Sequence, residues 1–111
     1  MRKKARHDNT LQLLEQVVYG MQEKKAKHIV SLNLSKIPNA VAQYFVICHA
    51  PSKTQVGAIY DEVMENVQKQ TGVKPFNREG YENSEWILID YVDVVVHIFL
   101  EDIRTFYHLE D

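Results

Sequence analysis

The sequence predicts an α+β fold, a single mixed β-sheet of about five strands with two main helices packed on it. Three observations lead to this fold class. Apolar residues recur at helical spacing in two long segments, and short runs rich in strand formers lie between and after them. The last two of these runs, residues 86–90 and 94–100, are separated by only three residues, which favours an antiparallel hairpin.

The first helix is predicted to begin at Asn9 or Thr10, the two candidate N-caps, and Gln12 is placed to close a capping box on Asn9. An apolar stripe then runs to about residue 21, and the helix should end between residues 20 and 25. Before it lies a basic run that has no apolar periodicity. We therefore expect a flexible basic N-terminus over residues 1–8 and a single domain over residues 9–111.

The middle of the chain predicts two strands and the second helix. Residues 29–34 alternate apolar and polar side chains, as a strand with one buried face does. Residues 44–48 are continuously apolar, which is typical of a central strand. Ser52 and Gln55 form a second capping box before an apolar stripe, and Gly72 is suited to the position just past the helix C-terminus.

The last third of the chain predicts the remaining strands. Residues 73–79 are expected to form a short strand at an edge or a bulge, because Pro75 cannot donate a ladder hydrogen bond. The hairpin of residues 86–90 and 94–100 follows. A short helix is expected to carry the apolar side chains at the end of the chain, Ile103, Phe106, Tyr107 and Leu109.

Composition narrows the classes of function. The formal net charge is −2, whereas a protein that grips nucleic acid over its whole surface is usually strongly basic. Cys48 is the only cysteine, so an intrachain disulfide is excluded, and its apolar surroundings indicate a small buried hydrophobe. With neither a membrane-spanning stretch nor a secretory signal in sight, we expect a cytoplasmic protein.

The residue pattern offers little for catalysis. No glycine-rich phosphate loop precedes a helix, and no two histidines have the helical spacing of a zinc site. Asp90 and Asp93 are the only candidates for paired carboxylates on the sheet, but they flank a turn and alternation does not place them together. A turn-shaping role suits them better than catalysis. We expect no enzyme activity, no catalytic residue, no metal and no cofactor.

The hairpin instead offers candidate residues for binding a partner. Trp86 and Tyr91 are large aromatic residues near a tight turn, and such residues often anchor protein interfaces. Tyr91 should project past the sheet, because a side chain at the turn is hard to bury in the protein's own core. His97 shares a strand face with Val95 and Phe99, opposite the strand of Trp86. The alternative for Trp86 is that it simply fills the core.

The same hairpin, residues 86–99, resembles the signature block of the ribosomal silencing factors, the RsfS or Iojap family. The resemblance covers nearly everything from the first helix onward, in order. The hairpin block is its specific part, and weaker similarity extends to residues 44–48, 52–59, 74–75, 79–80 and 104–110.

The resemblance implies a fold like a nucleotidyltransferase domain without its active site. It also implies a function, which is to bind the large ribosomal subunit through ribosomal protein L-fourteen, block association with the small subunit and repress translation. Trp86 and Tyr91 would then be docking residues. Asp90, Asp93 and His97 would shape or line the same surface.

Three positions depart from the family pattern. Val92 stands where the family usually has glycine, so the turn must do without a residue that adopts positive φ freely. Ala50 and Pro51 replace a glycine and a small polar residue before the second helix. Family members commonly continue into a Leu-Trp ending, whereas this chain stops at Asp111, so part of a C-terminal contact surface is expected to be missing.

Other functions stay open at this point. The chain could be a nucleotidyltransferase-like enzyme, which would need clustered acids, or an assembly factor for the large subunit, as organelle relatives are. The basic N-terminus, with Arg2, Lys3, Lys4 and Arg6, could add a peripheral ribosomal RNA contact or serve a general RNA-binding module. A homodimer is also left open.

Overall fold

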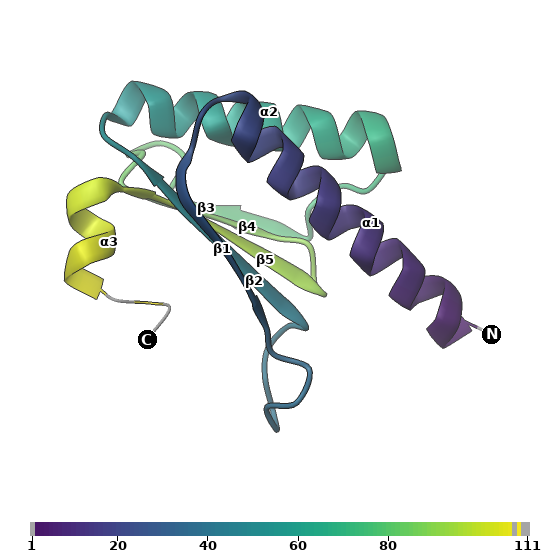
Figure 1. Cartoon of the computed structure of the whole chain (residues 1–111). Coiled ribbons are helices and arrows are strands. Elements are labelled where there is room, and N and C mark those ends of the chain that lie inside the picture. Colours follow the sequence, from purple (N-terminus) through teal and green to yellow (C-terminus); the bar gives the residue numbers. More distant parts are fainter. Residues whose placement is uncertain (1, 108, 110–111) are drawn as a thin grey trace.

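The computed structural model describes residues 2–107 and residue 109, with the side chains of residues 9–106 and 109. The elements follow in the order α1 (Arg2–Glu23), β1 (Lys27–Asn33), β2 (Tyr44–Ala50), α2 (Lys53–Thr71), β3 (Asn77–Glu79), β4 (Trp86–Asp90), β5 (Val94–Leu100) and α3 (Glu101–Tyr107). Figure 1 shows this arrangement.

The strands form one five-stranded sheet in the order β1-β2-β5-β4-β3. β2 and β5 run parallel at its centre, and the other neighbouring pairs are antiparallel. α2 belongs to the long connection from β2 to the later strands, since parallel neighbours cannot be joined by a tight turn. The predicted fold class, a mixed sheet with helices packed on it, is confirmed, as are the central place of residues 44–48 and the antiparallel hairpin.

The two long helices lie side by side along one side of the sheet, which we call the helix face (Figure 1). Strand alternation sends every second side chain toward them. The core between helices and sheet includes Val17 and Met21 from α1, Ile59 and Val63 from α2, and Ile98 from β5, all fully buried. The short α3 contacts β5 and β2 at one end of the sheet.

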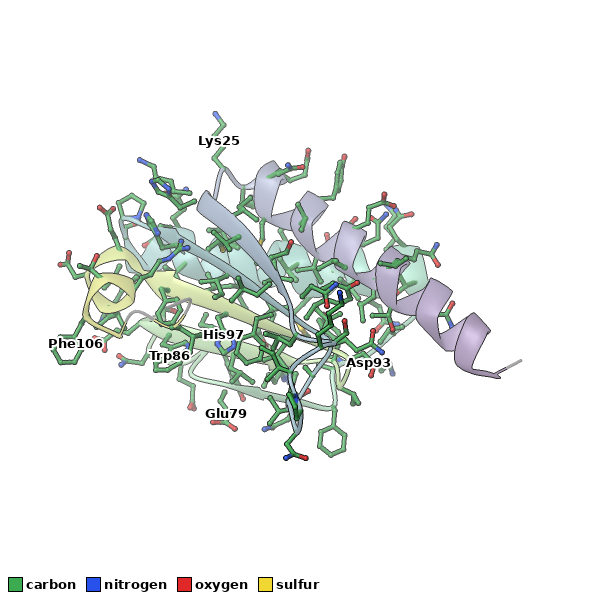
Figure 2. All side chains as sticks on the ribbon, turned by 60° about the horizontal axis from the view of Figure 1, so that its bottom comes forward. Lys25, Glu79, Trp86, Asp93, His97 and Phe106 are labelled. Atoms are coloured by element: carbon green, nitrogen blue, oxygen red, sulfur yellow. The ribbon has the colours of Figure 1, made fainter. Side chains whose placement is uncertain are left out.

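The opposite side of the sheet, which we call the second face, carries the alternate residues of the same strands. The strand register places Trp86 across from Phe99, Leu88 across from His97, and Ile47 beside His97. Within residues 2–107, neither of the long helices covers this side, and Figure 2 shows it obliquely, with the bottom of Figure 1 turned forward. Apart from β3, its residues are Val30, Leu32, Phe45, Ile47, His49, Trp86, Leu88, Asp90, Val95, His97 and Phe99.

Both ends of α2 lie where the sequence predicted them, but the Ser52–Gln55 capping box is borne out only in its Ser52 half. The Gln55 side chain, which was expected to close the box, donates through Nε2 to the backbone carbonyls of Lys24 and Lys25 at 3.1 and 3.3 Å. The Ser52 hydroxyl accepts a hydrogen bond from the Gln55 backbone N–H at 3.2 Å, which satisfies one of the free amides of the first turn. Gly72 adopts φ +73° past the C-terminus, and its N–H donates to the Gln68 carbonyl at 2.9 Å.

Three predicted boundaries were wrong. α1 begins at Arg2 and not at Asn9, because the preceding lysines, arginines and alanine favour helix and nothing among them stops it. β3 spans only Asn77–Glu79, since the chain between Gly72 and Phe76 makes no ladder. α3 ends at Tyr107, so Leu109 lies beyond the helix that was expected to carry it. The expected flexibility of residues 1–8 stays a prediction.

Candidate functional site

Trp86 and His97 form a hydrogen-bonded pair on the second face. The Trp86 Nε1–H donates to His97 Nδ1 at 3.1 Å, and Figure 2 shows the two side chains next to each other. The indole also packs on Phe99, its cross-strand neighbour, with ring centroids 4.9 Å apart. Trp86 is half-buried, so it neither fills the core fully nor stands free in solvent.

His97 lies beneath this surface, and only 4% of it is exposed. The ring of Phe45 packs against it at a centroid distance of 4.8 Å. Burial lowers the pKa of His97 from its ordinary 6.5 to about 4, so the imidazole is neutral at physiological pH. Its Nε2 atom is buried and finds no hydrogen-bond partner in the part of the chain that the structure describes.

A hollow of about 320 Å³ adjoins Trp86, lined also by Glu79, Gly80 and Leu88. Gly80 makes the close approach of backbones here possible. It adopts φ +79°, and a Cβ at this position would lie 2.1 Å from the Trp86 carbonyl oxygen. The hollow therefore depends on the absence of a side chain at residue 80.

The turn between β4 and β5 is tighter than a usual hairpin loop. The Asp93 N–H donates to the Tyr91 carbonyl at 3.0 Å, which closes a γ-turn around Val92. Val92 has φ +76°, a strained conformation for a β-branched residue. The Asp90 Oδ1 accepts the Val92 N–H at 2.7 Å and stabilises this turn. The predicted turn-shaping role of Asp90 is confirmed, and valine adopts the positive φ that glycine would adopt freely.

Asp93 ties the turn to two other elements. Its carbonyl accepts hydrogen bonds from the backbone N–H groups of Gln43 and Tyr44, at 2.9 and 3.0 Å. Its Oδ2 accepts the Thr10 hydroxyl of α1 at 3.3 Å. Asp90 and Asp93 thus have separate partners rather than a shared site. Among the described residues, no group of three or more His, Cys, Asp or Glu side chains is suited to hold a metal ion.

Tyr91 does not project from the turn, so that prediction was wrong. Only 5% of it is exposed, and its hydroxyl lies 3.8 Å from the Met64 sulfur of α2. The Tyr91 N–H donates to the Val94 carbonyl at 2.9 Å, which continues the ladder by one residue past β4. Alternation then places Tyr91 on the helix face, after Ile87 and Ile89. This burial raises the pKa of its phenol.

The structure therefore divides the five residues that the sequence singled out. Trp86 and His97 lie together on the second face, and Asp90 stands on the same face at the far end of β4. Asp93 is a half-buried connector at the turn, and Tyr91 belongs to the core. Phe45 and Leu88, half-buried residues of the second face, were not singled out. Strand alternation could have placed them beside His97, but only once the strand register was known.

A buried arginine was also missed. Arg104 is 7% exposed, its Nη1 donates to the His28 carbonyl at 2.7 Å, and it lies 2.9 Å from His49 Nδ1. The pKa of His49 is lowered, mainly by burial and then by the Arg104 charge. These contacts fasten α3 to β1 and β2. An arginine in a short terminal helix resembles any solvated charge, so the sequence held no signal for this role.

Two other expectations concern the body of the protein. Cys48 is fully buried, and burial raises the pKa of its thiol to about 12, which confirms a packing residue rather than a reactive one. Within residues 2–107, none of the helices is both long enough and apolar enough to cross a membrane.

Comparisons with known proteins identify a family that this chain resembles. The family profile described as "Ribosomal silencing factor during starvation" matches residues 7–111. The "Ribosomal silencing factor RsfS" of Halalkalibacterium halodurans is 43% identical over 99 residues, covering 89% of this chain and 83% of that protein. The protein of the same name from Bacillus subtilis is 36% identical, covering 92% and 85%.

Solved structures agree. A crystal structure of a Chromobacterium violaceum protein superimposes with a TM-score of 0.84 at 31% identity, covering 90% of this chain and 82% of that one. A Bacillus halodurans crystal structure gives a TM-score of 0.78 at 41% identity, covering 90% and 91%. "Protein Iojap, chloroplastic" of Arabidopsis thaliana is 42% identical over 69 residues, or 28% of that protein's length. The chain belongs to the ribosomal silencing factor (RsfS) family.

Proposed function

We propose that this chain is a ribosomal silencing factor that binds the large ribosomal subunit through ribosomal protein L-fourteen. Bound there, it blocks association with the small subunit and represses translation. Membership of the RsfS family and the names of its relatives support the silencing function. The proposed partner implies action where ribosomes work, which in a bacterial cell is the cytoplasm.

One observation carries the choice of docking surface. The only tryptophan of the chain is half-buried on the face of the sheet that no long helix covers, beside a hollow of about 320 Å³. Half-buried Phe45 and Leu88 extend this apolar surface across two further strand positions. Partly exposed aromatic rings next to a pocket are typical anchors of protein interfaces.

The five predicted residues then serve this surface in different ways. Trp86 makes the contact, with His97 beneath it, and Asp90 lies at the rim. Asp93 and Tyr91 keep the hairpin in place, one through α1 and one through α2. Binding alone accounts for silencing, because a folded domain lying at the subunit interface excludes the small subunit by its volume. No catalytic step is needed.

The test is cosedimentation with isolated large subunits, with small subunits and with intact ribosomes as comparisons. Wild-type protein should bind isolated large subunits and should bind neither small subunits nor intact ribosomes. Trp86→Ala should weaken this binding about thirtyfold or more, because an interface anchor contributes about 2 kcal/mol or more. The matched control is Tyr19→Ala on α1, which removes a 50% exposed aromatic from the opposite layer and should bind as wild type does.

A second measurement identifies the partner. A photoreactive amino acid at Leu88 should crosslink to protein L-fourteen, and added protein should lower the yield of joined subunits in a sucrose gradient. Crosslinking to another component would reject L-fourteen as the partner. Undiminished subunit joining at saturating protein would reject the silencing mechanism.

The basic residues near the start of α1 are proposed to add a peripheral contact with ribosomal RNA. Lys3 and Lys4 lie in the first turns of that helix. Replacing both by glutamine should weaken binding modestly and lower the salt slope by about 2, since each phosphate contact contributes about 1. Complete loss of binding with an intact fold would favour a general RNA-binding module instead.

A further inference from the structure

The hydrogen bond between Trp86 and His97 links the surface to a buried side chain. Nε1–H is the only polar group of an indole, and it donates to His97 Nδ1 at 3.1 Å. Trp86 is half-buried, whereas His97 is 4% exposed. The surface ring is thus attached to a ring that cannot turn freely.

Packing from both neighbouring strands fixes the imidazole. Phe45 of β2 contacts it at a centroid distance of 4.8 Å, and Phe99 of β5 lies at 6.3 Å. Leu88 of β4 stands directly across from it, and Ile47 of β2 stands beside it. A side chain enclosed in this way holds one rotamer, so its acceptor nitrogen has a fixed direction.

The second ring nitrogen shows that this histidine is not an optimal packing residue. Because Nδ1 accepts, the proton of the neutral ring lies on Nε2. Nε2 is buried and has no hydrogen-bond partner within the described residues. An apolar side chain of similar size would avoid leaving a donor unpaired, so the histidine costs the fold stability. A buried polar atom of this kind calls for an explanation, and the bond to Trp86 supplies one.

We infer that His97 is a positioning residue of the docking surface. It holds the Trp86 indole in one orientation and occupies its N–H, so the partner receives this ring in an apolar protein pocket rather than against a phosphate or another acceptor. The inference rests on the proposed function and deepens it. An indole whose N–H is already bonded offers a partner only its apolar faces and edges.

The charge state of His97 matters because a protonated ring would carry a proton on Nδ1 and could not accept from Trp86. The titratable residues of β2, β3 and β4 on this face are not direct cross-strand partners of His97, and Glu79 lies in the same row as His97, beyond Leu88. Glu79 of β3 pairs with Leu88, Asp90 of β4 pairs with Val95, and His49 of β2 pairs with Phe99. Burial is the cause that lowers the pKa of His97 to about 4, so the ring accepts at neutral pH.

The decisive experiment is a double-mutant cycle on binding to large subunits, using wild type, His97→Leu, Trp86→Phe and the double variant. His97→Leu removes the acceptor and should weaken binding about tenfold. Trp86→Phe keeps an aromatic ring without the N–H, so adding His97→Leu to it should have no further effect. Wild-type affinity of His97→Leu, or an equal loss in both backgrounds, would overturn the inference.

A measurement on the free protein separates this inference from the proposed function. Trp86 is the only tryptophan, so the fluorescence of the chain's indole reports on it alone. His97→Leu should speed the decay of its anisotropy, and His97→Gln, whose amide oxygen can accept, should restore slow decay in part. An unchanged anisotropy in His97→Leu would overturn the positioning role. Wild type that failed to bind large subunits would reject the proposed function instead, whatever the anisotropy.

Lowering the pH provides a second test of the hydrogen bond between Trp86 and His97. The emission of wild type should change with a midpoint near pH 4 while circular dichroism shows the fold intact, and His97→Leu should lack this step. An identical step in both proteins would show that another group causes it and would count against the bond.

Discussion

The two faces of the sheet are built from the same strands but differ in what covers them. On the helix face, Ile87, Ile89 and Tyr91 alternate along the hairpin and are all nearly or fully buried under α1 and α2. On the second face, Trp86, Leu88 and Asp90 alternate along the same stretch and are all half-buried. One hairpin therefore supplies both the core and the proposed docking surface, and a shift of one residue decides between them.

Trp86 and Tyr91 show what this difference teaches. Both are large aromatic residues of the same hairpin, and both were predicted from the sequence to dock a partner. Five positions separate them, an odd number, so alternation places them on opposite faces as long as the ladder continues to Tyr91. It does continue, through the bond from the Tyr91 N–H to the Val94 carbonyl. The variants below test this division of roles.

The largest effect is expected for Tyr91→Ala, which removes a buried ring from the helix face. The free energy of unfolding should fall by about 3–5 kcal/mol, measured by urea denaturation. Tyr91→Phe loses only the weak contact with the Met64 sulfur and should be nearly as stable as wild type and bind large subunits fully. A stable Tyr91→Ala that fails to bind would return Tyr91 to the docking surface.

Acid should act on the second face through His97. The pKa of His97 is about 4 in the folded protein and near 6.5 in the unfolded chain, so the unfolded chain binds the proton more tightly. The stability that the neutral ring contributes is present above pH 6.5 and is lost as the pH falls toward 4. The difference of about 2.5 between the two pKa values corresponds to a loss of roughly 3 kcal/mol in the free energy of unfolding.

Urea titrations at several pH values check this expectation. His97→Leu should show a flatter dependence of unfolding free energy on pH between 6.5 and 4 than wild type. Parallel curves for the two proteins would mean that other groups govern acid stability. The second face would then not differ from the helix face in its response to acid through His97.

Gly80→Ala should damage the second face and spare the helix face. The new methyl group would meet the Trp86 carbonyl oxygen, and alanine is strained at φ +79°. We expect a loss of about 2 kcal/mol or more in unfolding free energy, with a shift in the emission of Trp86. Gly72→Ala is the control, since it shares the positive φ and has open space around it. Equal losses in the two variants would rule out the steric contact.

The smallest effect should come from the turn that joins the two faces. Val92→Gly relieves a β-branched residue at φ +76° and should raise the unfolding free energy by about 1 kcal/mol, after the entropy of glycine is subtracted. Val92→Ala keeps the positive φ and should lie closer to wild type. Lower stability of Val92→Gly in thermal denaturation would show that the turn is not strained.

The sequence by itself determined the elements whose signals are local. The hydroxyl of Ser52 and the free φ of Gly72 delimit α2, and a connection of three residues sets the pairing of β4 with β5. The hairpin motif also led to the family, because a run of specific residues can be recognised from the sequence alone. The start of α1 was missed, since a good cap at Asn9 does not end a helix that good helix formers extend.

Only the tertiary structure decided which side chains are covered, because coverage depends on elements that are distant in the chain. Tyr91 is buried because α2 passes over the helix face, and Arg104 is buried because β1 and β2 accept it at the end of the sheet. The pair of Trp86 and His97 likewise depends on the register of two strands. Residue type sets what a side chain can bond, and the packing of remote segments sets what it meets.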